Sequence, residues 1–385
     1  MKKMIDGFKT TFNTSPTACG VAPGRLEILG NHTDYNEGFV LSCAVTQHTR
    51  IALKPVSGSK CRLMDLRDGS HAEFDLNDIA VAKPRDWSNY IKGLIVELAK
   101  RGIKVGAFDA AILSNVPLSA GMSSSAALEM AAAMAFEQAF DIKLSKPDWG
   151  RVGQGVENNY MHLKTGLLDQ FSSLYGKKDS MILSDFRTVK VLETVPMPAG
   201  FSFVVANSMV KHNLVDSEYN SRRLDCEQAA AKLAVLLPGI KTLRDVTMQE
   251  LEDHQSDLTE REYRRAKHVV GECQRVKSAI TALKRNDIGD FGALLFASHA
   301  SSRYNFENSS PELDILVDFA EASPLCIGAR LSGGGFGGIT IHLVAQNDVP
   351  EYCEKLRIDF QKKVQQDPQI IVCNIGDGAH GELLK

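Results

Sequence analysis

The chain has 385 residues, of which 44% are hydrophobic and 24% charged, a composition typical of a globular protein with a large core. Its formal net charge of −3, without a long basic run, argues against a nucleic-acid-binding surface, and no apolar stretch reaches the roughly 18–20 residues of a membrane helix. The N-terminal segment has no apolar region of the kind found in secretion signals, so we expect a cytoplasmic protein.

The eight cysteines are scattered along the chain, and no two of them have the CxxC spacing of a zinc site. Several stand in apolar runs, such as LSCAV at residues 41–45. Unpaired cysteines of this kind are usually buried, and disulfides are rare in the reducing cytosol. We therefore expect buried thiols.

The first half of the chain mixes strand-like and helix-like segments. Residues 38–56 are rich in Val, Ile and Thr and predict paired strands. Residues 123–140 are rich in Ala, Leu, Met and Glu and predict a long helix. Apolar spacing and helix or strand breakers predict further helices over 87–102 and 151–166, the second ending at Gly166, and strands over 107–115 and 179–186.

After residue 200 the pattern restarts. The sequence predicts a strand over 201–208, a helix over 217–237, a charged and mostly helical region to about residue 302, and a glycine-rich loop that runs into a strand over 331–345. Helices mixed with largely antiparallel or mixed sheets are typical of an α+β fold. We expect two domains, residues 1–195 and 196–385.

A dense polar cluster lies near the N-terminus, in the stretch GRLEILGNHTDYNEGFVLS at residues 24–42. A fold does not need this many hydrogen-bonding side chains in so short a segment. Neutral polar groups with one or two carboxylates suit the hydroxyls of a small ligand. The polar residues of the cluster are Arg25, Glu27, Asn31, His32, Asp34, Tyr35 and Asn36.

A loop of small residues precedes the long predicted helix, in PLSAGMSSSAALEM at residues 117–130. Helix N-termini present unpaired N–H groups and a positive dipole end, so they bind anions, and a glycine such as Gly121 lets the backbone approach a ligand closely. Alternatively, one of the serines at 123–125 simply caps the helix. The loop lacks the Gly-Lys-Ser/Thr of a Walker A motif, so spacing alone predicts a phosphate loop of another type.

Two more stretches carry candidate chemistry. SGGGFGG, residues 332–338, holds five glycines in seven residues, which indicates either close backbone approach to a ligand or a hairpin turn. Together with the serine loop it favours a polyphosphate ligand. In TGLLDQFSSLYG, residues 165–176, Asp169 is either a catalytic carboxylate or an ordinary capping or solvated side chain.

Taken in order, these stretches resemble the galactokinase branch of the GHMP small-molecule kinases. The resemblance rests on APGRLEILGNHTDYNEGFVL, LSAGMSSSAALE, GLLDQFSSLYG and LSGGGFGG, and NSMVKHNLVDSEYNSRRLDCE and SHASSRYNFENSSPELD extend it over nearly the whole chain. It implies a two-lobed GHMP kinase fold, with an N-terminal lobe like domain 2 of ribosomal protein S5, a C-terminal ferredoxin-like α/β lobe, and the active site between them.

The resemblance also implies an activity. A member of this branch would use ATP and Mg²⁺ to phosphorylate the anomeric C1 hydroxyl of a monosaccharide, here galactose, and would give galactose 1-phosphate. We expect a monomeric enzyme of galactose metabolism that binds a sugar and ATP and neither nucleic acid nor membrane.

Site residues follow from the match, position by position. The resemblance implies that Asp169 is the base for the sugar hydroxyl and that Arg25 lies beside it. It implies Mg²⁺ ligands at Ser125 and Glu157. It assigns phosphate binding to Ser119, Gly121, Ser123, Ser124 and Ser125, and sugar binding to Asn31, His32, Asp34, Gly166, Tyr219 and Gly334.

The chain departs from the family at Asn31. The family usually reads Gly-Glu-His-Thr-Asp-Tyr-Asn where this chain reads GNHTDYN, and that Glu normally faces the C6 end of the sugar. A sugar carboxylate about 4 Å from a Glu would suffer about 4 kcal/mol of repulsion at an effective dielectric near 20, roughly a thousandfold in affinity. The uncharged Asn31 therefore leaves open a C6-altered substrate such as galacturonate, or arabinose, which lacks C6.

Two functions from other classes stay open. A sugar- and ATP-binding sensor without catalysis belongs to the same family, but such relatives are expected to damage the serine loop or the catalytic Asp, and both are intact here. A kinase for a mevalonate-type or homoserine-type substrate would want basic residues in place of the polar cluster at 31–36.

Overall fold

The computed structural model describes residues 1–118, 121–163, 165–211 and 215–384. The chain divides into two compact units, residues 1–25, 44–178 and 376–385 in the first and residues 26–43 and 179–375 in the second. The division falls within β1 (Ala18–Leu29) and β2 (Phe39–Pro55). The expected lobe boundary between residues 195 and 196 stays a prediction, because the units follow contacts and interleave along the sequence.

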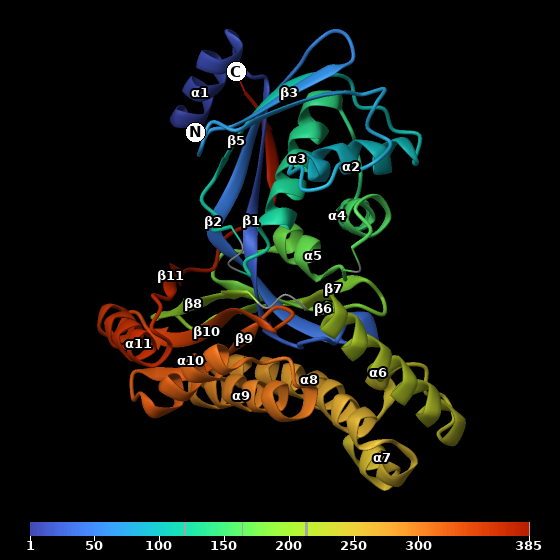
Figure 1. Ribbon diagram of the computed structural model, residues 1–385, viewed down its shortest axis with the longest axis vertical. Helices are drawn as coiled ribbons and strands as arrows, with labels where there is room; N and C mark the ends of the chain where they lie inside the picture. Colours follow the sequence, from blue (N-terminus) through green and yellow to red (C-terminus); the bar gives the residue numbers. More distant parts are fainter. Residues whose placement is uncertain (119–120, 164, 212–214, 385) are drawn as a thin grey trace. The chain divides into compact units, whose positions relative to one another are not determined.

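The first unit is built on a sheet whose strands follow the order β12-β1-β2-β5-β3-β4 (Figure 1). Most neighbouring strands are antiparallel, and β3 runs parallel to β5. The C-terminal strand β12 pairs with the start of β1, so the last residues of the chain complete the unit that the first residues begin. The remaining strands are β3 (Lys60–Asp65), β4 (His71–Asp75), β5 (Phe108–Ser114) and β12 (His380–Leu383).

Helices cover both faces of this sheet, as Figure 1 shows. Side chains alternate between the faces of a strand, so Ala52 and Ala111 pack against Met4 and Phe8 of α1, while Ile51 faces the opposite side. That side packs against α2, α3 and α4 in one large core. The helices of the unit are α1 (Lys2–Phe12), α2 (Asn89–Ala99), α3 (Ser124–Phe140), α4 (Lys146–Gly155) and α5 (Leu168–Tyr175), with a π-helical turn at Val156–Tyr160.

The second unit contains two groups of strands. β6 (Ser180–Asp185) pairs with the first residues of β2 and with β7 (Lys190–Pro196). A separate antiparallel sheet follows the order β11-β8-β10-β9. Its strands are β8 (Phe201–Lys211), β9 (Cys326–Ser332), β10 (Gly337–Ala345) and β11 (Gln369–Cys373).

Helices pack on one face of this sheet. Val204 and Val344 of the sheet share a buried cluster with Leu316 of α10 and with Tyr352 and Leu356 of α11. The long helix α8 begins at a capping box formed by the side chains next to its start. The helices of the unit are α6 (Val215–Leu236), α7 (Met248–Asp253), α8 (Glu260–Lys284), α9 (Ile288–Ser301), α10 (Pro311–Ala322) and α11 (Val349–Val364), with short turns at Asp34–Asn36, Leu243–Asp245, Gln255–Asp257 and Ser302–Phe306.

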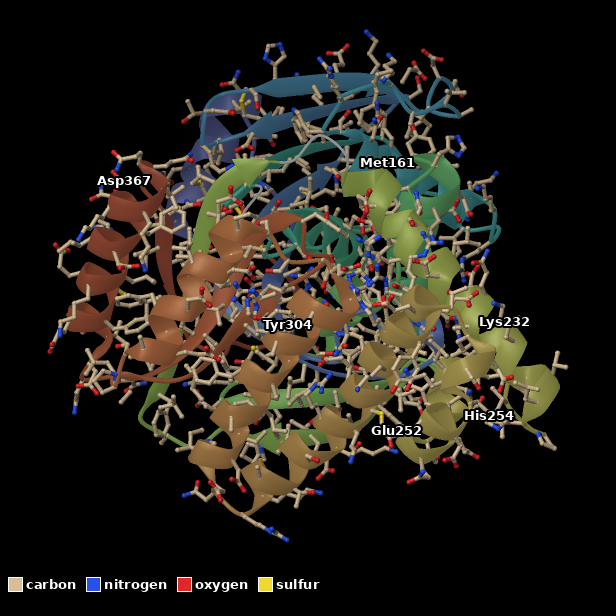
Figure 2. All side chains as sticks on the ribbon, turned by 60° about the horizontal axis from the view of Figure 1, so that its bottom comes forward. Met161, Lys232, Glu252, His254, Tyr304 and Asp367 are labelled. Atoms are coloured by element: carbon tan, nitrogen blue, oxygen red, sulfur yellow. The ribbon has the colours of Figure 1, made fainter. Side chains whose placement is uncertain are left out.

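Long helices of the second unit are tied together by polar side chains. Lys232 on α6 donates a 2.7 Å hydrogen bond to the carboxylate of Glu262 on α8. Figure 2 locates Lys232, together with Glu252 at α7 and His254 just beyond it. The charged, mostly helical region predicted up to residue 302 is therefore confirmed as a packed set of helices.

Two predicted elements differ from the structure. Residues 39–55 form the single strand β2, not two paired strands, because β6 pairs with one end and β5 with the other and no turn interrupts it. The helix predicted over 151–166 ends in the π-helical turn at Val156–Tyr160. The chain reverses there because the carbonyl of Asn158's side chain accepts a 2.8 Å hydrogen bond from the backbone N–H of Thr165.

Burial follows the sequence expectation for the cysteines, six of which are buried and two partly buried. Burial raises the pKa of the Cys61 thiol to about 12, so it is a poor nucleophile at neutral pH. Among the helices of the described ranges, none is both long and apolar enough to cross a membrane.

Candidate active site

Asp169 lies in a hydrogen-bonded cluster of the first unit. The Nε of Arg25 donates a 2.8 Å hydrogen bond to its Oδ1, and the hydroxyl of Ser123 donates to its Oδ2. The Nη1 of Arg25 also donates to the carbonyl of Gly121 at 2.5 Å. The side chain of Arg25 is 8% exposed and that of Asp169 is 30% exposed, so the carboxylate is anchored and still accessible.

Local backbone geometry explains how Arg25 comes close to the serine loop. A Cβ on Gly24 would lie 2.7 Å from the carbonyl of Met122, so only glycine lets β1 approach the serine loop this closely. The backbone N–H of Arg25 donates to that same carbonyl at 3.1 Å. Asp169 stands in the first turn of α5, where the helix dipole favours a negative charge.

The serine loop leads into the N-terminus of α3. Ser123 occupies the N-cap position with a left-handed φ of 52°, and among the described residues of this loop its side chain makes no capping hydrogen bond, because the hydroxyl is donated to Asp169. Ser124 and Ser125 are the first residues of the helix and are half-buried. The first-turn N–H groups of α3 are therefore placed to bind an anion. Ser119, predicted to bind phosphate, lies outside the described residues.

Two buried carboxyl groups lie on the helices around this loop. Glu157 is 5% exposed and accepts a hydrogen bond from the hydroxyl of Thr165, with the side chains of Gln170 and Ser125 beside it. Burial and the negative charge of Asp169 raise its pKa. Glu129 is fully buried, and burial holds the pKa of its carboxyl well above its usual range.

These oxygens fit Mg²⁺. The Ser125 hydroxyl and the Glu157 carboxylate are hard donors of the kind that magnesium prefers, and a cation would relieve the crowded negative charge that raises the pKa of Glu157. The described residues contain no group of three or more His, Cys, Asp or Glu side chains arranged as a metal site. A magnesium ion that arrives with a nucleotide needs only one or two protein carboxylates, since phosphates supply other ligands.

A cavity of about 340 Å³ opens beside the start of α3. Aromatic rings of Trp87 and Tyr90 line it together with Ser124 and Ser125. An apolar, aromatic wall next to an anion-binding helix end is suited to a flat base joined to phosphates. Sequence reasoning missed Trp87 and Tyr90, because the motifs that it used contain only the phosphate end of such a site.

In the second unit, the side chain of Asn31 is buried and fully engaged. Its Nδ2 donates to a carboxylate oxygen of Glu27 and to the carbonyl of Gly333, both at 2.8 Å. Its Oδ1 accepts from the Nδ2 of Asn308 at 2.9 Å. Asn31 therefore joins β1 to the glycine-rich loop, a role that its polar character alone did not reveal.

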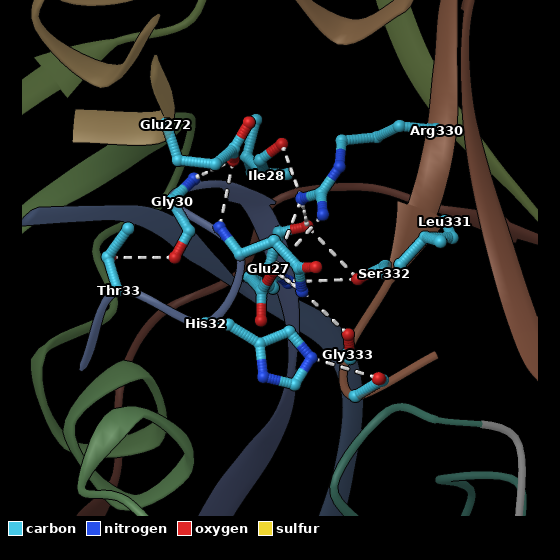
Figure 3. A network of polar contacts seen from close by, with 12 residues as sticks. Glu27, Ile28, Gly30, His32, Thr33, Glu272, Arg330, Leu331, Ser332 and Gly333 are labelled. Atoms are coloured by element: carbon cyan, nitrogen blue, oxygen red, sulfur yellow. Dashed lines mark hydrogen bonds and ion pairs between the residues drawn. The ribbon is translucent and has the colours of Figure 1, made fainter. Parts of the chain in front are cut away.

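A buried ion pair stands behind Asn31. Arg330 extends from β9 and donates to the Glu27 carboxylate at 3.2 Å and to the carbonyl of Ile28 at 3.0 Å (Figure 3). Arg330 is fully buried and Glu27 is 4% exposed. Ser332 adds a hydroxyl that donates to the Glu27 carbonyl at 3.0 Å. Among the described residues the buried Nε of Arg330 has no hydrogen-bond partner, so the contacts of Nη1 and Nη2 compensate the buried charge.

The backbone of the polar cluster is held by Glu272 on α8. One oxygen of this fully buried carboxylate accepts from the N–H groups of Gly30 and Asn31, at 2.8 and 2.9 Å (Figure 3). The other accepts from Arg275 at 2.6 Å. The positive charge of Arg275 helps to hold the pKa of Glu272 far below its usual range, despite burial.

His32 links the polar cluster to the glycine-rich loop. Its Nε2 lies 3.0 Å from the carbonyl of Gly334, which can only accept, so this nitrogen carries the proton, and its Nδ1 accepts from the Tyr35 hydroxyl at 2.9 Å. The rings of Tyr219 and Phe306 pack within 5.0 Å of it. Burial lowers the pKa of His32 to about 4, so it is neutral at physiological pH.

The glycine-rich stretch is the hairpin between β9 and β10, as the simpler alternative predicted, and it is also tied to the polar cluster. Gly335 has a φ of 82°, and a Cβ there would lie 2.1 Å from the carbonyl of Asn308.

Asp34 is half-buried at the first residue of a 3₁₀ turn, and Gly166 is half-buried before α5. Within the second unit, the structure thus brings together Asn31, His32, Tyr219 and Gly334.

Sequence comparisons identify the relatives of this chain. Residues 6–55 match the galactokinase galactose-binding signature, residues 89–177 the N-terminal domain of GHMP kinases and residues 279–361 their C-terminal domain. The chain is 37% identical over 379 residues to a galactokinase of Actinobacillus pleuropneumoniae serotype 5b (strain L20), covering 97% of both chains. It is 36% identical over 378 residues to a galactokinase of Roseiflexus sp. (strain RS-1), covering 98% of this chain and 96% of the relative.

Solved structures share the fold of this chain. The crystal structure of Lactococcus lactis galactokinase complexed with galactose matches with a TM-score of 0.93 and 30% identity over 98% of both chains. A mevalonate kinase crystal structure matches with a TM-score of 0.63 and 18% identity over 93% of this chain and 98% of the other, a likeness of fold alone. The predicted two-domain GHMP kinase fold is confirmed, and the chain belongs to the galactokinase family of sugar kinases.

Proposed function

We propose that this enzyme transfers the γ-phosphoryl group of ATP to the C1 hydroxyl of galactose and gives galactose 1-phosphate and ADP. The observation that carries the proposal is the cluster of Asp169, Arg25 and Ser123 next to the N-terminus of α3. It combines a carboxylate, a guanidinium group and an anion-binding helix end within one unit, which are the groups that phosphoryl transfer requires.

Asp169 is the proposed base. The C1 hydroxyl of a free sugar is more acidic than an ordinary alcohol, so a carboxylate can accept its proton. As the proton moves to Asp169, the hydroxyl oxygen bonds to the γ-phosphorus, and the bond from phosphorus to the β–γ bridging oxygen breaks, leaving its electron pair on ADP. Arg25, whose Nε holds Asp169 at 2.8 Å, keeps the carboxylate oriented and offsets negative charge nearby.

The nucleotide contacts are assigned to the first unit. Kinases of this family use ATP. We place the phosphates at Gly121, Ser123, Ser124 and Ser125, with Ser119 as a further predicted contact. The cavity lined by Trp87 and Tyr90 supports a base-binding role, because it borders Ser124 and Ser125.

Mg²⁺ is proposed at Ser125 and Glu157. When bound, it would neutralise charge on the transferring phosphates. Glu157 is suited to this role because the side chains beside its carboxylate, those of Thr165, Gln170 and Ser125, are neutral and not cations.

The sugar contacts are assigned to Asn31, His32, Asp34, Gly166, Tyr219 and Gly334. Their support is chemical. They offer neutral hydrogen-bonding groups, an aromatic surface and one carboxylate, which suit the hydroxyl and C–H faces of a hexose. The galactose in the Lactococcus lactis structure supports galactose as the sugar of this chain.

The alternatives weaken on particular observations. A sensor without catalysis is not favoured, because the Asp169 cluster and the start of α3 are complete among the described residues. The galacturonate alternative rested on a missing carboxylate at Asn31, yet the carboxylate of Glu27 lies 2.8 Å from the Asn31 amide. A cytoplasmic location and a monomeric state stay predictions, the first supported by the burial of most cysteine thiols.

ADP release from purified enzyme, ATP and Mg²⁺ tests the proposal against galactose, galacturonate, glucuronate, L-arabinose, galactosamine and glucose. We expect galactose to give the highest kcat/KM. A higher kcat/KM with arabinose or galacturonate would make that sugar the assigned substrate in place of galactose. ATP binding without ADP release on any sugar would favour the alternative function, a sensor without catalysis.

A further inference from the structure

The amide group of Asn31 has a fixed orientation. Its neighbours on one side are the Glu27 carboxylate and the Gly333 carbonyl, both at 2.8 Å and both able only to accept. On the other side, Asn308 donates to Oδ1 at 2.9 Å. The NH₂ group must therefore face Glu27 and Gly333, because the opposite orientation would oppose acceptor to acceptor.

This orientation limits what Asn31 can offer to a ligand. Both hydrogens of its Nδ2 are donated to protein oxygens, and one lone pair of its Oδ1 accepts from Asn308, so the second lone pair of Oδ1 is the one hydrogen-bonding position that these contacts leave for a substrate. A carbonyl oxygen accepts a hydrogen bond from a hydroxyl. It repels a carboxylate, which has nothing to donate.

Glu27 is the residue that sets the orientation. Its carboxylate is fixed by Arg330 at 3.2 Å, and Arg330 is itself anchored to the Ile28 carbonyl at 3.0 Å. Because Glu27 is 4% exposed and Arg330 is fully buried, the pair cannot swing toward solvent. The Glu27 carboxylate is thus a fixed negative charge and a fixed hydrogen-bond acceptor next to the Asn31 side chain.

We propose that Glu27, acting through Asn31, is a specificity-determining residue that selects a neutral, hydroxyl-bearing sugar and rejects an acidic sugar. The inference rests on the proposed function, in which Asn31 contacts the sugar. Glu27 acts as a positioning residue, because its carboxylate contacts the Asn31 amide and is 4% exposed. The missing glutamate at position 31 therefore does not open the site to uronates.

The test compares kcat/KM for galactose and galacturonate in the wild type and in Glu27→Gln. We expect the wild type to prefer galactose by at least about a hundredfold, since a carboxylate would meet only acceptors at Asn31. In E27Q the neutral amide at position 27 can donate as well as accept a hydrogen bond, so it no longer requires the NH₂ group of Asn31 to face it. The positive charge of Arg330 is then uncompensated. We expect the galacturonate-to-galactose ratio to rise at least about tenfold.

A matched control separates specificity from loss of packing. Ser332→Ala removes a hydroxyl that touches the Glu27 backbone but leaves the carboxylate in place, so the ratio should stay within about twofold. If E27Q fails to fold, E27Q/R330Q removes both charges of the pair and leaves no unpaired buried charge. We expect its ratio to rise at least about threefold, because the double variant has no buried negative charge behind Asn31 to repel the carboxylate of the sugar.

The outcomes are distinguishable. An unchanged ratio in the folded E27Q or double variant, or equal use of both sugars by the wild type, would overturn the role of Glu27 and leave the kinase proposal standing. A ratio that rises as far in S332A as in E27Q would also overturn it. Phosphorylation of neither sugar by the wild type would overturn the proposed function and this inference with it.

Discussion

The Nε of Arg25 lies 2.8 Å from the Oδ1 of Asp169, although 144 residues separate the two in the chain. Arg25 reaches this position from β1, whose backbone contacts the serine loop through the carbonyl of Met122. The same guanidinium group also binds the carbonyl of Gly121. One arginine therefore fixes both the proposed base and the proposed phosphate loop, so the geometry of the reaction depends on it.

Asp169→Asn should lower kcat by at least about a hundredfold, because the amide cannot take the proton of the C1 hydroxyl. The substitution is isosteric and keeps a hydrogen-bond acceptor toward Arg25, so folding and ATP binding should be close to those of the wild type. Steady-state ADP release and calorimetric ATP titration measure the two properties. Turnover within tenfold of the wild type would remove Asp169 from the role of base.

Trp87→Ala should raise the KM for ATP at least about tenfold and leave the KM for the sugar within about twofold. The reason is the loss of an aromatic wall from the 340 Å³ cavity beside Ser124 and Ser125. Tyr90→Phe is the control, since it keeps the ring and should change the KM for ATP little. If the KM for the sugar rises as much as the KM for ATP, the cavity is not a binding site for the base of ATP.

Glu272→Gln should raise the KM for the sugar at least about tenfold, with the KM for ATP within about threefold. Its carboxylate receives two backbone N–H groups of the polar cluster, and a neutral amide would hold them less strongly. Arg275→Lys keeps a positive charge beside Glu272 and should have the smaller effect. Kinetics with each substrate varied in turn decide the matter, and an unchanged sugar KM in folded E272Q would contradict this role.

Stability should fall as the pH drops below about 6.5, because histidines that are buried and neutral in the folded state gain protons when the chain unfolds. Burial lowers the pKa of His342 and His268 to about 3, well below the usual value of about 6.5 for histidine. A lowered folded pKa contributes stability above the unfolded pKa, and this contribution is lost as the pH falls toward the folded pKa. For His342, the free energy of unfolding should lose about 2 kcal/mol between pH 7.5 and 5.

The variant His342→Gln isolates this contribution. It retains hydrogen-bonding groups near Tyr352 and Thr340 and should make the pH dependence of urea unfolding shallower by that amount. His71→Gln, which replaces an exposed histidine, should leave the slope unchanged. Parallel slopes for H342Q and the wild type would show that His342 does not carry the effect.

Local patterns predicted much of the fold. The Ala-rich segment became α3, and the strands and helices of the second half lie close to their expected ranges, because apolar periodicity is a local property. The break after Tyr160 was not predicted, since it depends on a π-helical turn and a side-chain contact to Thr165. The continuity of β2 depends on which strands pair with it, which its own residues do not encode.

The candidate site was predictable only in part. Asp169, Arg25 and the serines followed from motifs, and the structure brings them together. Glu272 and Arg330 were missed because each acts on residues about 240 to 300 positions away, at a pairing that only the fold creates. The hydrogen bonds of the Asn31 side chain could not be predicted for the same reason.

The most direct test of the central claim is the identity of the product made from galactose and ATP, followed by ³¹P and ¹³C nuclear magnetic resonance. We predict one phosphorylated sugar with the phosphate on C1, formed in equal amount to ADP by the wild type and not by Asp169→Asn. A phosphate on any other carbon, or ADP formed without a sugar phosphate, would contradict the assignment of this enzyme as a sugar-1-kinase for galactose.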